Sequence, residues 1–287
     1  METKKTLDLD GFSLTYWLDR VAGARHTLVM IHGLASNHTR WTEFVESTRL
    51  RGRWNLLRLD QRGHGESMYR GAINRERWVA DLDALIRAEG LAPVVLLGHS
   101  LGVETAMDYT VTHPGRVEGL IVIDPVIPEY LTGLLGWSRR LHWLLKPVIW
   151  LIRLANRLGL RRRHFPPRDL YALDRRTRAT LAAHPGMRIS ELYMNPSADF
   201  PYIPLANYLQ DLYEVVRPLP DLSIIRVPTL VIMSSHSTLS DIQKSQIRLR
   251  AIPRVEIREI ECDHWPLTEK PGEVRQVIDE WCGKTLP

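Results

Sequence analysis

A serine between two glycines, at the end of an apolar run, has the setting of a nucleophile. Residues 94–102 read Val-Val-Leu-Leu-Gly-His-Ser-Leu-Gly, which places Ser100 in a Gly-x-Ser-x-Gly pattern, and a helical pattern follows. At such a strand-to-helix turn the serine hydroxyl is exposed, and the glycines leave room for the neighbouring backbone. The amides and dipole at the start of the helix favour developing negative charge. The spacing therefore predicts that Ser100 attacks a carbonyl carbon.

Six apolar runs bounded by turn residues alternate with helical patterns along the chain. They comprise residues 27–31, 55–59, 94–97, 119–123, 229–233 and 254–260. Continuous apolar runs of this length indicate strands buried in a parallel sheet, with the helical patterns as crossovers. Residues 6–9 and 12–18, joined by Asp10-Gly11, predict an antiparallel hairpin at one sheet edge. We therefore expect an α/β fold, a mostly parallel sheet flanked by helices, with Ser100 just after its strand.

The alternation of strands and helices stops after Ile123 and resumes near Ser223. Between them, residues 127–222 contain no clear strand and hold ten of the 18 prolines. Proline disrupts helix interiors, so this segment should form several short helices. The predicted organisation is a core of residues 1–126 and 223–287, interrupted after the sixth strand by residues 127–222, which we call the helical insert.

The amino-acid composition is that of a globular protein. The 287 residues are 44% hydrophobic and 25% charged, which fits one large globular domain or a domain with an insertion and excludes intrinsic disorder. Two cysteines, Cys262 and Cys282, exclude a disulfide framework and fit a reducing compartment. The first eleven residues lack the apolar region of a signal peptide. We therefore expect a cytoplasmic protein.

Four motifs stand in an order that resembles the α/β-hydrolase superfamily. His32-Gly33 follows a strand, and residues 60–67 read Asp-Gln-Arg-Gly-His-Gly-Glu-Ser after the next one. The Gly-x-Ser-x-Gly pattern comes third, and Cys-Asp-His-Trp-Pro at 262–266 follows the last strand. The resemblance covers the whole predicted core. It implies an α/β-hydrolase fold with a helical cap, and a serine hydrolase that forms an acyl-enzyme.

The resemblance also implies a role for each site residue. His264 would be the base that takes the Ser100 proton and later returns it to the leaving group, which suits a side chain that titrates near neutrality. The backbone N–H groups of Leu34 and Leu101 would form the oxyanion hole. His32 and His64 would order loops. No cofactor or metal is implied, since no residue spacing matches a familiar ligand set.

The acid that should orient His264 has two candidates. Most relatives place it shortly after the strand at 229–233, but that position falls on Ser237, and Asp241 comes some four residues later on the expected next helix. Some family members, certain lipases and lactone hydrolases among them, place the acid after the preceding strand, where this chain has Asp124. We favour Asp124 because a strand end holds a side chain more firmly than the start of a helix, and keep Asp241 as the alternative.

The expected reaction is cleavage of a carboxylic ester with an apolar acyl or alkyl group, as in carboxylesterases and lipases. A lactone hydrolase is the alternative, and acyltransferases, carbon–carbon-bond hydrolases and non-catalytic ligand-binding or signalling proteins share the same apparatus. The expected partner is a small ester or lactone. Nucleic-acid binding is not expected, because no nucleic-acid motif appears.

The net charge of +5 is concentrated in one part of the helical insert. Residues 130–168 carry nine Lys or Arg and no acid, while the rest of the chain sums to −4. Within them, a basic stripe runs along a Trp-rich apolar pattern, which Pro147 should break into two helices and Gly159 should end. Two interpretations are open: a lid whose basic, Trp-rich part at 137–163 meets a lipid interface, or a helix packed on the core with its cations in water.

Overall fold

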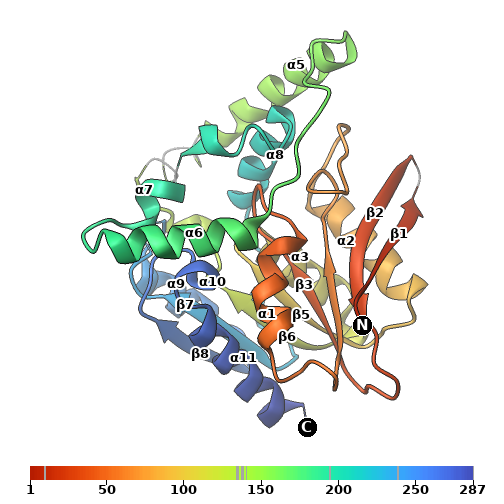
Figure 1. Cartoon of the computed structure of the whole chain (residues 1–287), viewed down its shortest axis with the longest axis vertical. Helices are drawn as coiled ribbons and strands as arrows, with labels where there is room; N and C mark the ends of the chain where they lie inside the picture. Colours follow the sequence, from red (N-terminus) through yellow and green to blue (C-terminus); the bar gives the residue numbers. More distant parts are fainter. Residues whose placement is uncertain are drawn as a thin grey trace.

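A computed structural model gives the arrangement of the chain (Figure 1). It describes residues 1–9, 11–133, 136, 139, 141–193, 195–237 and 239–286. The turn residue Asp10 and, in the basic segment, Trp137 and Arg140 lie outside the described residues, so the expectations that concern them are left as predictions.

Eight strands form one sheet in the order β1-β2-β4-β3-β5-β6-β7-β8. β1 pairs antiparallel with β2, and β2 with β4, whereas the other neighbours are parallel. The predicted edge hairpin and the six predicted strands are thereby confirmed. The predicted burial fails for β8, which is the other edge strand and in which only Ile260 is buried. The strands are β1 (Thr3–Leu9), β2 (Phe12–Asp19), β3 (Thr27–Ile31), β4 (Asn55–Leu59), β5 (Val94–His99), β6 (Val117–Ile123), β7 (Thr229–Ser234) and β8 (Val255–Ile260).

Helices cover both faces of the sheet, which explains why its central strands are apolar on both sides. Along β3, Val29 and Ile31 pack with helices α2, α3 and α9 in one core, and Leu28 and Met30 pack with α1 and α11 in the other. The bounds are α1 (Thr42–Ser47), α2 (Arg75–Ala88), α3 (Leu101–Thr112), α9 (Ile242–Leu249), α10 (Pro266–Glu269) and α11 (Pro271–Thr285). Short 3-10 turns lie at His38–Trp41 and Pro114–Arg116.

The part of the helical insert that the structure describes contains α-helices and 3-10 turns and no named strand. Its α-helices are α5 (Leu145–Arg157), α6 (Leu170–Ala183), α7 (Ile189–Tyr193) and α8 (Leu205–Val215). Figure 1 shows them above the carboxyl ends of the parallel strands. The 3-10 turns are Pro128–Tyr130, His142–Leu144, Pro196–Ala198 and Leu222–Ile224. The domain boundaries themselves stay predictions.

The basic, Trp-rich segment is organised differently from the prediction. Pro147 is the third residue of α5, so the expectation that it separates two helices is wrong. In the first turn of a helix the missing proline N–H has no intrahelical partner to lose, which is why α5 tolerates it. Gly159, with φ +95°, does end the helix as expected.

Helix α5 leaves most of its apolar side chains in solvent instead of burying them on the core. Ile149 is buried, but Trp150 is 61% and Leu151 is 56% exposed. The interpretation of a helix packed through its apolar side is therefore wrong. None of the described helices has the length and apolar character needed to cross a bilayer.

The N-terminal end of α3 lies against the end of β3, and this approach requires glycine. A Cβ added at Gly102 would lie 2.3 Å from the carbonyl oxygen of Ile31 and 2.6 Å from that of His32. Real Cβ atoms do not come that close to backbone oxygens, so the helix would have to move away from the strand. Gly102 thereby permits the short distance between α3, which follows Ser100, and the end of β3.

Gly102→Ala should therefore destabilise the fold by about 2–3 kcal/mol, since the clash is with backbone that cannot rotate away. The matched control is Gly283→Ala, also within a helix, where an added Cβ meets nothing within 4 Å. That variant should be neutral or slightly stabilising, because alanine favours helix over glycine. Urea unfolding of both variants checks this, and equal stability of the two would contradict it.

Candidate active site

Ser100 lies on the turn between β5 and α3 in a conformation that non-glycine residues rarely adopt. Its φ and ψ are +51° and −124°. Its N–H donates to the carbonyl of Ile123 at 3.1 Å, and its own carbonyl accepts from the N–H of Val103 at 2.8 Å. A Cβ at Gly98 would lie 2.6 Å from the carbonyl oxygen of Gly102, so both glycines of the motif are needed for the turn. Such strain persists where the surrounding structure holds it in place.

A chain of hydrogen bonds joins Ser100, His264 and Asp124. His264 Nε2 is 3.2 Å from Ser100 Oγ, and His264 Nδ1 is hydrogen-bonded to Asp124 Oδ2. With Nδ1–H donating to the carboxylate, Nε2 is left to accept the Ser100 hydroxyl proton. The other oxygen, Asp124 Oδ1, accepts from the N–H of Ser234 at 2.9 Å. His264 and Asp124 are both buried.

The alternative acid, Asp241, lies outside this chain of contacts. It precedes α9, where its Oδ1 accepts from the N–H of Lys244 at 3.1 Å and its Oδ2 lies 3.0 Å from Lys244 Nζ. These contacts hold the pKa of Asp241 below its ordinary value. The expectation that Asp241 already belongs to the next helix region is confirmed, and its carboxylate caps that helix.

The two residues expected to supply oxyanion donors lie beside Ser100. Leu101 is the first residue of α3. Leu34 follows Gly33, where an added Cβ would lie 3.1 Å from both the Cβ of Ser100 and the carbonyl oxygen of His99. The chain after β3 is therefore in contact with the turn that carries Ser100.

The surroundings of these residues are apolar. Leu34 and Leu101 belong to one cluster with Val126 and with Val215 of α8. Leu34 also contacts a second cluster that includes Tyr208 of α8. An acyl or alkyl group placed here would meet hydrocarbon rather than water, which favours apolar groups.

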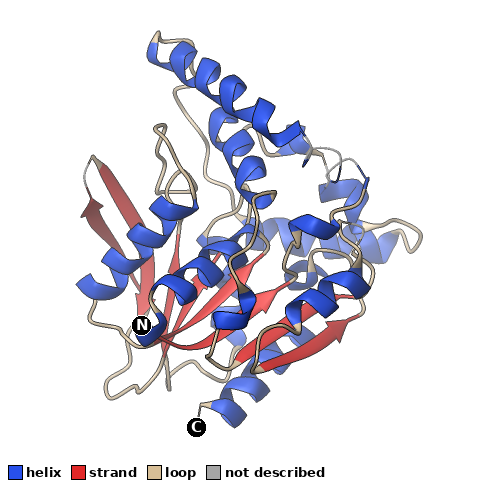
Figure 2. Cartoon of the chain, turned by 180° about the vertical axis from the view of Figure 1, so that it is seen from behind, coloured by secondary structure: helices blue, strands red, loops and turns tan. Residues whose placement is uncertain are grey.

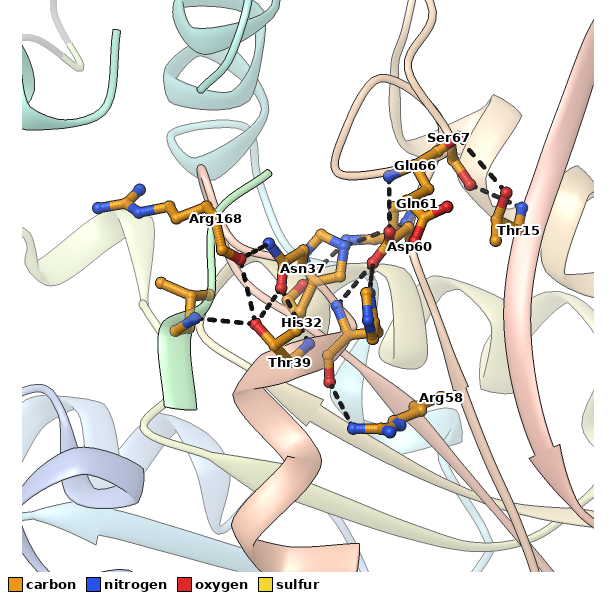
Figure 3. A network of polar contacts seen from close by, with 12 residues as sticks. Thr15, His32, Asn37, Thr39, Arg58, Asp60, Gln61, Glu66, Ser67 and Arg168 are labelled. Atoms are coloured by element: carbon orange, nitrogen blue, oxygen red, sulfur yellow. Dashed lines mark hydrogen bonds and ion pairs between the residues drawn. The ribbon is translucent and has the colours of Figure 1, made fainter. Parts of the chain in front are cut away.

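A polar network fixes the loop that follows β3 (Figure 3). Asp60 Oδ1 accepts from the N–H of His38 at 2.6 Å, and its Oδ2 accepts from the N–H of Glu66 at 2.7 Å. Burial acts to raise the pKa of Asp60, but these donors and the His38 ring lower it overall. On the other side, Asn37 Nδ2 donates to the carbonyl of Arg168 in the helical insert at 2.7 Å. The loop is thus tied to both the sheet and the insert.

His32 and His99 are buried and are kept neutral by their surroundings. Burial lowers the pKa of His32 to about 3, with the nearby His64 acting in the same direction. Burial, followed by the neighbouring His264, holds the pKa of His99 well below its ordinary value. His32 Nε2 accepts from the N–H of Gln61 at 3.1 Å, which fits its expected loop-ordering role. Among the described histidines, His264 is the one within hydrogen-bond distance of Ser100 Oγ.

Sequence reasoning missed two contacts by which the helical insert supports this site. His64 Nε2 is 2.8 Å from Asp211 Oδ2, and Asn207 Nδ2 donates to the carbonyl of Gly63 at 3.1 Å. Both partners from the insert, Asn207 and Asp211, lie one turn apart on α8. Their spacing on one helix was the only available signal.

The loop that carries His264 is also held by residues that sequence reasoning missed. Arg188 forms an ion pair with Asp263, whose N–H donates to Glu269 Oε1 at 2.9 Å. Arg40 Nη1 donates to Thr268 Oγ1 at 2.8 Å and also contacts Asp174 of α6. Arg188 and Arg40 are far from their partners in the sequence, so no local pattern could have indicated these two contacts.

Comparisons with known proteins indicate the family to which the chain belongs. A family model described as alpha/beta hydrolase family matches residues 28–277. The mouse sn-1-specific diacylglycerol lipase ABHD11 is 32% identical over 121 residues, 42% of this chain and 39% of that protein. A putative esterase/lipase of Haemophilus influenzae is 38% identical over 97 residues, 34% of this chain and 33% of that protein. The chain thus matches two fifths or less of the length of these relatives.

A solved structure shows the same fold along the whole chain. The thermophilic esterase from Thermogutta terrifontis superimposes with a TM-score of 0.70 at 22% identity, and the match covers 100% of both chains. The family match spans most of the present chain, including every strand from β3 to β8. The chain therefore belongs to the alpha/beta hydrolase family.

Proposed function

We propose that the protein hydrolyses a carboxylic ester with an apolar acyl or alkyl group, through Ser100, His264 and Asp124. The observation that carries this proposal is the continuous contact from Ser100 Oγ through His264 to Asp124, at the strained turn after β5. This is the geometry of a nucleophile, its base and the group that orients the base. The relatives named as esterase and lipase support the same bond type.

The reaction proceeds in two halves. Ser100 Oγ attacks the ester carbonyl while its proton passes to His264 Nε2, and the carbonyl oxygen becomes an oxyanion near the N–H groups of Leu34 and Leu101. His264 then gives the proton to the departing alkoxide, which leaves an acyl-enzyme on Ser100. Water, deprotonated by His264, attacks the acyl carbon, and Ser100 leaves with the proton as the acid is released. Asp124 holds the imidazole in place and stabilises the imidazolium that forms in each half of the reaction.

The helical insert serves as a cap in this proposal. Its helix α8 contributes Tyr208 and Val215 to the apolar clusters that contain Leu34 and Leu101. Those side chains would line the space around the acyl group and exclude water from it. The cap therefore selects for apolar groups, and the partner is a small-molecule ester.

Ser100→Ala should lower the rate of turnover of 4-nitrophenyl esters by at least about 10⁴-fold, because no other group can form the acyl-enzyme. A fluorophosphonate probe should label the wild-type chain on the peptide that contains Ser100, as read by mass spectrometry. The control is Ser235→Ala, whose buried hydroxyl has no hydrogen-bond partner. That variant should keep its activity and its labelling.

A set of esters of increasing acyl length, with several lactones, identifies the substrate class. Medium or long acyl chains should be turned over faster than acetate, because the surroundings of the site are apolar. If lactones are turned over faster than every open-chain ester, the proposed function would be a lactone hydrolase instead of an esterase. Ligand binding without turnover of any substrate would refute the enzymatic proposal.

Asp124→Asn should lower kcat by about 10⁴-fold. The new amide would donate to His264 Nδ1, so the imidazole proton would stay on Nε2, and Nε2 could not then accept the hydroxyl proton of Ser100. Asp241→Asn removes the same charge from a helix cap outside the contact chain, so it should keep activity within about twofold. Steady-state kinetics of the two variants compare the acids directly. The opposite ranking would assign the acid to Asp241.

A further inference from the structure

Helix α5 presents an apolar face to solvent. In Figures 1 and 2 the helix extends beyond the rest of the molecule at the top. At 100° per residue, one side of it is formed by large apolar side chains that are all exposed. These are Val148, Trp150, Leu151, Leu154 and Leu158. The preceding turn adds the exposed Trp143 and Leu144.

The opposite side of α5 holds the helix on the molecule. Ile149 is buried on this side, where α5 packs along α8. His142 and Lys146 both contact the ring of Tyr213 on α8, with the His142 ring at 5.6 Å and Lys146 Nζ at 5.1 Å from its centre. The exposed face is therefore fixed in an outward direction.

Cations without acidic partners border this face. Residues 130–168 contain no Asp or Glu. Of the cations that the structure describes there, only Arg168 is in an ion pair, with Asp199 at 2.6 Å. Arg157, Arg161, Arg162 and Arg163 are exposed at the end of the helix and just after it. Together they form a positive border beside the Trp and Leu side chains.

We propose that α5 docks the protein on the surface of an anionic lipid bilayer. The Leu and Val side chains would enter the outer acyl region, Trp143 and Trp150 would lie at the level of the headgroups, and the arginines would contact lipid phosphates. A helix with these three features lies flat in a membrane interface. Each cation near an anionic surface and each buried apolar group strengthens such binding.

Charge favours a bilayer over a second copy of this chain as the occupant. Two copies that met through their α5 faces would offer these arginines no acidic partner, because residues 130–168 contain no Asp or Glu, and interfaces favour complementary charges. An anionic bilayer neutralises the same arginines. The proposal concerns binding alone and does not depend on the hydrolase activity.

Flotation with vesicles tests the proposal on the full-length protein. We expect binding to vesicles of phosphatidylglycerol mixed with phosphatidylcholine, weak binding to phosphatidylcholine alone, and release at high salt. Leu151→Glu with Leu154→Glu should abolish binding. The matched control is Ile224→Glu with Ile247→Glu, which places the same charges on exposed apolar residues outside α5, with Ile247 70% exposed. The control should bind like the wild type.

A second pair of variants tests the charge contribution. Arg157→Gln with Arg161→Gln should weaken binding to the anionic vesicles about 25-fold at low salt, from about fivefold for each cation. Arg250→Gln with Arg254→Gln removes two exposed arginines elsewhere and should have a much smaller effect. Thermal unfolding of all four double variants verifies that each is folded.

Three outcomes would overturn the proposal. The first is equal recovery of the wild type with neutral and anionic vesicles, and the second is unchanged binding of the Leu151→Glu, Leu154→Glu variant. The third is a dimer in sedimentation velocity that this variant abolishes while no vesicle binding occurs, which would assign the face to a second copy. Repeating the flotation with Ser100→Ala separates the result from the proposed function, since binding should be unaffected.

Discussion

Helix α3 approaches the end of β3 closely, and this contact positions several groups of the candidate site. Gly102 permits it, because any side chain there would collide with the carbonyl oxygen of Ile31. The approach places the chain after Gly33 against the turn of Ser100, so nucleophile and expected oxyanion donors are set by one backbone contact. Ser100 in turn is held by its N–H bond to Ile123, the residue directly before Asp124. Three elements of the site are therefore positioned by backbone packing rather than by side-chain contacts.

Helix α8 connects the sheet, the candidate site and the surface of the molecule. Asn207 and Asp211 hold the loop that contains Gly63 and His64, and Tyr208 and Val215 pack in the clusters around Leu34 and Leu101. Its outer side supports α5. Helix α8 therefore lies between α5 and the apolar surroundings of Ser100.

The sequence predicted the elements with strong local signals. The six strands after the edge hairpin, and the hairpin itself, follow from continuous or alternating apolar runs, and the turn at Ser100 follows from its two glycines. For the acid that orients His264, the sequence left two candidates, Asp124, which was favoured, and Asp241. Local pattern alone could not decide between them, because the distance of each to His264 depends on the order of β6, β7 and β8 in the sheet. The contacts of Arg40 with Asp174 and of His64 with Asp211 join segments more than a hundred residues apart. The direction of α5 was left open between two interpretations, because apolar periodicity shows that a helix has an apolar face and not what that face contacts.

The position of Asp124 has a consequence for the loop between β7 and α9. With the acid proposed at the end of β6, neither Ser237 nor Asp241 is needed as the acid in that proposal. Leu239 and Asp241 anchor the helical insert instead. The N–H of Asp241 donates to the carbonyl of Tyr130 at 2.9 Å, and the N–H of Thr132 donates to the carbonyl of Leu239 at 2.9 Å. The beginning of the helical insert is thus anchored to the loop after β7, while the proposed acid lies at the end of the neighbouring strand, β6.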